Sequence, residues 1–130
     1  MKKENAQIRI KRAYDPPDAS DGTRVLVDRL WPRGLRKADA ELACWLKEIA
    51  PSPGLRQWFG HDPERYAEFA RHYRGELEGN QDEVARLESL VKQGPVTLLY
   101  AAHDQERNHA RVLAEYLRDR MERVHGKRPV

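Results

Sequence analysis

The chain has 130 residues, of which 39% are apolar and 35% charged, with a formal net charge of +3 and one cysteine. This length and composition indicate a single globular domain with a heavily charged exterior, and they exclude two ordinary domains. They also exclude an internal disulfide and a membrane-spanning helix, because no apolar run approaches the roughly 20 residues that a bilayer requires.

The N-terminal part of the chain predicts two strands. Residues 1–5 are expected to be frayed, and residues 7–14 then alternate polar and apolar, the pattern of a half-buried strand. Residues 15–22 are rich in Asp, Pro and Gly and predict a loop. Residues 24–28 form an almost continuously apolar run, which is typical of a central strand in a parallel sheet.

The middle of the chain predicts helices. Four apolar residues at helical spacing indicate a first helix that ends at residues 51–54: Leu42, Trp45, Leu46 and Ile49. A short helical turn over residues 55–59 follows. Asp62 and Pro63 then form a favourable helix opening, with Asp62 as the cap, and Gly79 with Asn80 should break this long helical stretch.

The last part of the chain predicts a third strand, residues 96–101, and a final helix that runs to about Gly126. Asp104 is expected to cap this helix, whose inward face would be Ala110, Leu113, Leu117, Met121 and Val124. Together the segments predict an α/β fold: a small, mainly parallel, three-stranded sheet covered by about four helices, in one helix-rich domain over residues 1–130.

Polar side chains follow the second and third predicted strands. The second strand runs into Asp28, Arg29, Trp31 and Arg33, and the third into Tyr100, His103, Asp104, Asn108 and His109. The carboxyl ends of parallel strands open on the same edge of a sheet, where ligands usually bind. We therefore expect the two segments to form one pocket.

The residue types at this edge predict recognition of an anion. Arg29 and Arg33 carry planar guanidinium groups suited to carboxylate or phosphate, although Arg29 is equally compatible with a structural ion pair. Asp28 is a candidate general base, or a group that orients Arg29, and we favour the second role. His109 at the start of the last helix is a candidate acid, base or anion ligand, or a surface residue that bonds to its own helix cap.

The remaining candidates have structural alternatives. Tyr100, His103 and Asn108 are candidate ligand contacts, and Trp31 is either a pocket wall or a half-buried core residue. Residues 58–62 form either a helix opening or a flap over the site. Cys44, predicted to lie in a helix beside Trp45, is expected to be a small buried apolar group.

Several common motifs do not occur. The sequence contains no Cys-x-x-Cys, no His-Glu-x-x-His, no glycine-rich phosphate loop and no Gly-x-Ser-x-Gly. It therefore predicts no metal site and no cofactor.

Three blocks of sequence resemble a known family: residues 25–34 (VLVDRLWPRG), residues 55–63 (LRQWFGHDP), and residues 98–104 (LLYAAHD) followed by Asn108-His109-Ala110. They are similar to the YeaO-like branch of the domain of unknown function 488 family. The resemblance implies a compact bacterial or archaeal cytoplasmic α/β protein and no particular activity. Another branch of that family resembles rhodanese-like domains and carries a cysteine near the last strand. This chain has Tyr-Ala-Ala-His there, so sulfur transfer is not expected.

The leading functional hypothesis is a pocket for a small phosphorylated or carboxylated ligand, in an enzyme or in a binding protein. An interaction module without catalysis is the first alternative. A nucleic-acid-associated protein is the second, since residues 1–37 carry ten Lys and Arg against five Asp and Glu. No nucleic-acid-binding module is recognisable, which argues against it. No membrane partner is expected, and the sequence predicts no oligomeric state.

Overall fold

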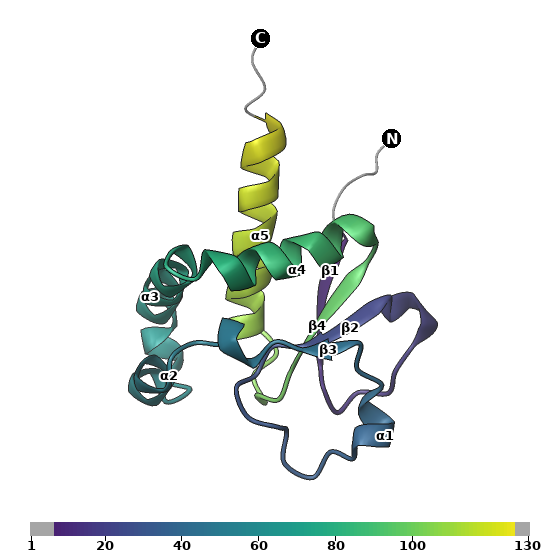
Figure 1. Ribbon diagram of the computed structural model, residues 1–130. Helices are drawn as coiled ribbons and strands as arrows, with labels where there is room; N and C mark the ends of the chain where they lie inside the picture. Colours follow the sequence, from purple (N-terminus) through teal and green to yellow (C-terminus); the bar gives the residue numbers. More distant parts are fainter. Residues whose placement is uncertain (1–6, 127–130) are drawn as a thin grey trace.

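The structure is a computed structural model that describes residues 7–126, with side chains up to residue 122. It is an α/β fold with one four-stranded sheet (Figure 1), in which every strand pair is parallel. The strands are β1 (Ile8–Arg12), β2 (Thr23–Leu26), β3 (Cys44–Trp45) and β4 (Val96–Tyr100), in the order β1-β4-β2-β3. The expected fraying of residues 1–5 and the inward position of the Val124 side chain concern parts of the chain outside this description.

Within residues 7–126, five α-helices accompany the sheet: α1 (Lys37–Ala40), α2 (Pro53–Phe59), α3 (Tyr66–Glu78), α4 (Gln81–Gln93) and α5 (His109–Gly126). Short 3-10 turns cover Ala19–Asp21, Lys47–Ile49 and Pro63–Arg65. The expected helix opening is confirmed, because the Asp62 side chain accepts a hydrogen bond from the Glu64 amide and Pro63 begins the turn. The break at residues 79 and 80 is confirmed as well.

The fourth strand corrects the sequence prediction, which placed a helix over residues 42–50. Cys44 and Trp45 form β3, paired with Val25 and Leu26 of β2, so Cys44 lies in a strand. The side chains alternate, with Cys44 and Leu46 packed in one core and Trp45 in the other. Without β3, one edge of the buried strand β2 would keep unpaired backbone groups, and this requirement outweighs the helical spacing.

The two faces of the sheet are covered differently. Helices α3, α4 and α5 lie together on one side of the sheet (Figure 1), where they form the main core with Val25, Leu98 and other buried residues. On the opposite face, Leu26 and Leu99 are covered by segment 31–45, whose Trp31 and Trp45 pack against them. The second face therefore has a small core of its own, built mostly from loop residues.

The start of the last helix differs from the prediction in one detail. The Asn108 side chain accepts a hydrogen bond from the Arg111 amide at 2.9 Å, which is the bond of an N-terminal cap. Asp104 instead caps the preceding turn through the amides of Glu106 and Arg107. Within the described residues, α5 and the other helices are all too short or too polar to cross a membrane.

Candidate functional site

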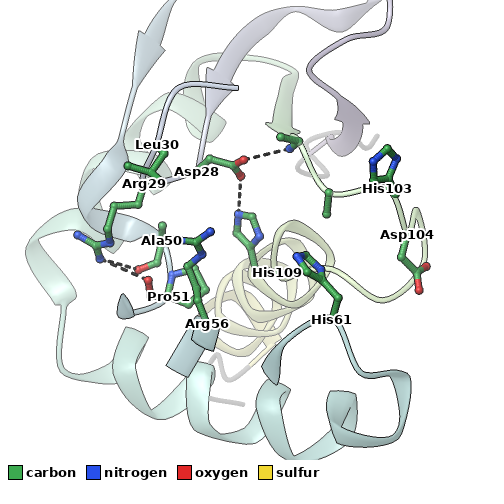
Figure 2. Close-up of a pocket in the computed structure, with 12 residues that line it drawn as sticks. Asp28, Arg29, Leu30, Ala50, Pro51, Arg56, His61, His103, Asp104 and His109 are labelled. Carbon is green, nitrogen blue, oxygen red and sulfur yellow. Dashed lines mark hydrogen bonds and ion pairs between the residues drawn. The ribbon is translucent and has the colours of Figure 1, made fainter. Parts of the chain in front are cut away.

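The carboxyl ends of β2 and β4 lie side by side, because Leu26 pairs with Leu99 in parallel register. A hollow of about 510 Å³ opens at this edge. We call it the site pocket, and Figure 2 shows the side chains that line it: Asp28, Arg29, Leu30, Ala50, Pro51, Arg56, His61, Ala101, Ala102, His103, Asp104 and His109. Its volume is in the range of small-molecule sites.

Asp28 and His109 are in direct contact across the pocket. The Asp28 Oδ2 atom accepts a hydrogen bond from the Ala101 amide at 3.0 Å, and Oδ1 lies 2.9 Å from His109 Nε2. The same Nε2 atom lies 3.0 Å from the Val27 carbonyl oxygen, toward which its hydrogen points, so the Oδ1 contact is electrostatic rather than a directed hydrogen bond. The Val27 carbonyl therefore orients the His109 ring beside the Asp28 carboxylate. Among the described residues no hydrogen bond or ion pair joins Asp28 to Arg29, which it was expected to orient, because Arg29 binds Glu48 and Ala50.

This arrangement fixes the proton on the His109 ring. A carbonyl oxygen only accepts hydrogen bonds, so Nε2 carries a hydrogen in the neutral and in the charged ring. In the neutral ring, Nδ1 is then an acceptor, and among the described residues it has no hydrogen-bond partner. The Val27 carbonyl thus sets the tautomer, and the Asp28 carboxylate lies beside the same nitrogen.

Arg29 holds a loop of the pocket wall. Its Nη2 donates to the Ala50 carbonyl at 3.1 Å, and Nη1 lies 3.4 Å from a Glu48 carboxylate oxygen, so the structural ion pair considered for Arg29 is present. Its Nε atom is buried and has no partner among the described residues. Arg29 therefore holds the wall of the pocket, and its Nε is closed off from the hollow.

Arg56 is a pocket residue that the sequence did not predict, whereas His61 belongs to residues 58–62, for which a flap over the site was one of two predictions. Arg56 lies in α2 and points into the hollow beside His109 (Figure 2), and no acidic side chain of residues 7–122 lies within ion-pair distance of it. His61 follows Gly60, and both have a left-handed backbone, with φ of +58° and +53°. The sequence around Gly60 gave a signal for a bend here, whereas nothing in it distinguished Arg56 from other helical arginines.

Acidic groups also line the pocket. Hydrogen bonds from the Arg107 and Glu106 amides lower the pKa of Asp104 below its ordinary value, so this carboxylate is ionised at neutral pH. It lies 3.2 Å from the Arg107 guanidinium. With Asp28 bound to Ala101 and Asp104 beside Arg107, both carboxylates of the lining have partners of their own, whereas Arg56 has no acidic partner among residues 7–122.

Four of the predicted site residues lie outside the site pocket. Trp31 packs on the other face of the sheet, with its Nε1 bonded to the Leu35 carbonyl and its ring against Trp45. The exposed Arg33 contributes only its carbonyl, which accepts a bond from Tyr14. Tyr100 is buried in the main core, where burial raises the pKa of its hydroxyl. Asn108 is the cap of α5 and borders a smaller neighbouring cavity.

The pocket contains three histidines and two carboxylates, but the described part of the chain has no cluster of three or more His, Cys, Asp or Glu that could hold a metal ion. Cys44 lies at the sheet edge outside the pocket, and burial raises the pKa of its thiol, which lowers the thiolate fraction. The lining is therefore suited to binding by charge and hydrogen bonds.

Fold and lining define the class: an α/β protein with a pocket at the carboxyl edge of its parallel sheet, where charged side chains and apolar surface meet. Residues 7–130 match the family described as "Inactive DUF488-N3 subclade", and the chain belongs to this family. The membership confirms the family resemblance of the sequence blocks.

Bacterial relatives are similar over almost their whole length. The uncharacterised protein YeaO of Escherichia coli K12 is 50% identical over 111 residues, 85% of this chain and 96% of YeaO. The uncharacterised protein Rv3073c of Mycobacterium tuberculosis H37Rv is 44% identical over 114 residues, 88% of this chain and 96% of that protein. No solved structure matches the chain.

Proposed function

We propose that the protein binds a small anionic ligand in the site pocket. The observation that carries this proposal is Arg56, whose guanidinium points into a hollow of about 510 Å³ and has no acidic partner among the described residues. The Nδ1 atom of His109, which has no hydrogen-bond partner among the described residues, lines the same pocket. Guanidinium groups bind carboxylates and phosphates through paired hydrogen bonds, and partial enclosure strengthens such contacts.

Binding without turnover is the form of this function that we favour. The description of the family uses the word "inactive". The His109–Asp28 pair would then hold a polar group of the ligand, with the free Nδ1 as acceptor. Proton transfer by the same pair is the second candidate, supported by the 2.9 Å contact between the Asp28 carboxylate and the His109 ring and by the unpartnered Nδ1.

The test is a ligand screen with the Arg56→Ala variant. Sodium acetate and sodium phosphate should raise the melting temperature of the wild type at millimolar concentration, because a ligand that binds only the folded state stabilises it. Arg56→Ala should weaken this binding at least tenfold, the lower range for a charged hydrogen bond of about 1.5–3 kcal/mol.

Arg36→Ala is the matched control. Arg36 is four-fifths exposed, lies outside the pocket and has only a surface ion pair with Asp39. Its removal should change neither stability nor binding measurably. Anion binding that is equal in wild type and Arg56→Ala would overturn the proposal.

A further inference from the structure

The Nδ1 atom of His109 is a hydrogen-bond acceptor that is open to the site pocket. Because Nε2 donates to the Val27 carbonyl at 3.0 Å, the lone pair of the neutral ring is on Nδ1. The buried side-chain atoms of the described residues that lack a partner are Arg24 Nη2, Asp28 Oδ1 and Arg29 Nε, and His109 Nδ1 is not one of them. This nitrogen is therefore both unpartnered and accessible from the hollow that His109 lines.

Arg56 supplies the complementary group next to this acceptor. Its guanidinium points into the hollow beside His109 (Figure 2), and both residues also line the smaller neighbouring cavity, which has a volume of about 60 Å³. The guanidinium only donates hydrogen bonds, whereas Nδ1 of the neutral ring only accepts them. A ligand that satisfies both groups must carry an anionic oxygen together with a hydrogen that it can donate.

Exposure distinguishes His109 from the two other histidines of the lining. The His109 side chain is 15% exposed, whereas His61 and His103 are exposed to solvent. Water can serve the nitrogen atoms of an exposed ring, but fewer waters reach the sheltered Nδ1 atom of His109. A sheltered acceptor without a partner costs free energy, so a donor on the ligand gains most at this position.

Resting on the proposed function, we infer that the ligand is a hydroxylated anion, a small molecule with a hydroxyl group beside its carboxylate or phosphate. The anionic group binds Arg56, and the hydroxyl donates to Nδ1 of His109. Hydroxy acids and phosphorylated alcohols share this chemistry, and the hollow of about 510 Å³ has room for either. The hydroxyl gives the site its specificity, because an anion without it leaves Nδ1 unpaired.

The test compares hydroxylated anions with analogues in which a methyl group replaces the hydroxyl. The pairs are glycolate and propionate, 3-hydroxypropionate and butyrate, and 2-hydroxyethyl phosphate and propyl phosphate. In at least one pair the hydroxylated member should bind about two- to tenfold more tightly at pH 8, the range of a net neutral hydrogen bond. The acid and phosphate pairs together show which anionic group the site takes.

Nitrogen NMR of the wild-type protein tests the contact directly and needs no variant. Long-range proton–nitrogen spectra at pH 8 should show a neutral His109 ring with its hydrogen on Nε2. Titration with the preferred hydroxylated anion should move the Nδ1 resonance upfield, and further than titration with its methyl analogue. An equal shift with both compounds, or a ring that is still charged at pH 8, would overturn the inference.

A pair of variants localises the preference. His109→Phe keeps a ring but removes Nδ1, so it should lower the affinity for the hydroxylated anion to that for its methyl analogue. His72→Phe makes the same change at an exposed histidine outside the pocket and should keep the preference. Unfolding curves establish that both variants fold, and if His109→Phe does not, the Nδ1 resonance of the wild type decides.

The outcomes separate the two proposals. If both members of every pair bind equally and with Arg56 dependence, the hydroxyl inference is overturned and the anion pocket survives. If no anion of the series binds with Arg56 dependence, the proposed function fails and this inference with it.

Discussion

His61 and Glu41 are the non-glycine residues of the described chain with a left-handed backbone, at φ of +58° and +47°. Side chains with a Cβ atom rarely adopt this conformation, which costs about 1–2 kcal/mol. Glu41 is exposed at the end of α1, away from the pocket, whereas His61 lines both cavities. Strain that is retained at a pocket wall is consistent with a role in binding.

Replacement of His61 by glycine should separate stability from binding. His61→Gly relieves the backbone strain, so the free energy of unfolding should rise by about 0.5–1 kcal/mol in urea titrations. Affinity for acetate should fall, because a wall of the site pocket is lost. Glu41→Gly is the matched control and should gain similar stability with unchanged affinity. Unchanged affinity in His61→Gly would remove this residue from the site.

Only some residues of the site could be predicted from the sequence. Asp28 and His109 were predicted because each directly follows a recognisable strand or begins a recognisable helix, and their meeting follows from parallel pairing of β2 with β4. Arg56 was not predicted, because its direction depends on how α2 packs against α3. Trp31 and Arg33 were placed too close, since the chain turns to the other face of the sheet after Leu30.

A buried ion pair joins several elements on one face of the sheet. This is the face that segment 31–45 covers and that carries no long helix. Asp21 and Arg24 are each 5% exposed, and Asp21 Oδ2 lies 2.6 Å from Arg24 Nη1. Lys11 of β1 binds the same carboxylate at 3.0 Å, and the Thr97 hydroxyl of β4 donates to the Asp21 carbonyl. Arg24 Nε donates to the Ala40 carbonyl at the end of α1. Three strands and α1 therefore meet through these two residues.

The charge of Asp21 should make stability depend on pH. Burial alone would raise the pKa of Asp21, but bonds from Lys11, the Asp18 amide and Arg24 together lower it below the ordinary 3.8. A carboxyl with a lowered folded pKa contributes stability above its unfolded pKa, and this contribution disappears as pH falls through the folded value.

Asp21→Asn should therefore lower the free energy of unfolding at pH 7 by about 3 kcal/mol, because it leaves the buried Arg24 charge uncompensated. The difference from the wild type should shrink as the pH falls below about 4. Urea titrations at pH 7, 5 and 3 measure it. Asp39→Asn, in an exposed pair with Arg36, is the control and should change stability by less than about 1 kcal/mol at any of these values. A pH-independent loss in Asp21→Asn would contradict an electrostatic role.

Among the secondary-structure elements, the long helices and the apolar strands could be predicted from the sequence, whereas the two-residue strand β3 could not. β2 and β4 were recognisable because they are apolar along their length, and α3, α4 and α5 because each has one apolar stripe. β3 has two residues, too few for any periodicity, and exists because the outer edge of β2 needs hydrogen-bond partners. The four-stranded sheet is thus a property of tertiary pairing rather than of local sequence.

Stability should be unevenly distributed over the whole molecule. All five residues of β4 are buried between β1 and β2, whereas β3 is a two-residue strand at the sheet edge. The amides of Leu98 and Leu99 should therefore exchange with solvent only on global unfolding. The amide of Ala43, bonded to the Arg24 carbonyl beside β3, should exchange through local opening.

A ligand in the site pocket should act on these two classes of amide differently. The pocket is built by the ends of β2 and β4 together with α2 and α5, so global unfolding releases the ligand, whereas opening at Ala43 leaves the pocket intact. Acetate at ten times its dissociation constant should raise the protection of Leu98 and Leu99 by about 1.4 kcal/mol and leave that of Ala43 unchanged. Native-state hydrogen exchange by NMR measures both in one sample. Protection of Leu98 that does not respond to acetate would show that the anion does not bind the folded protein, and an equal rise at Ala43 would show that β3 opens only when the whole sheet does.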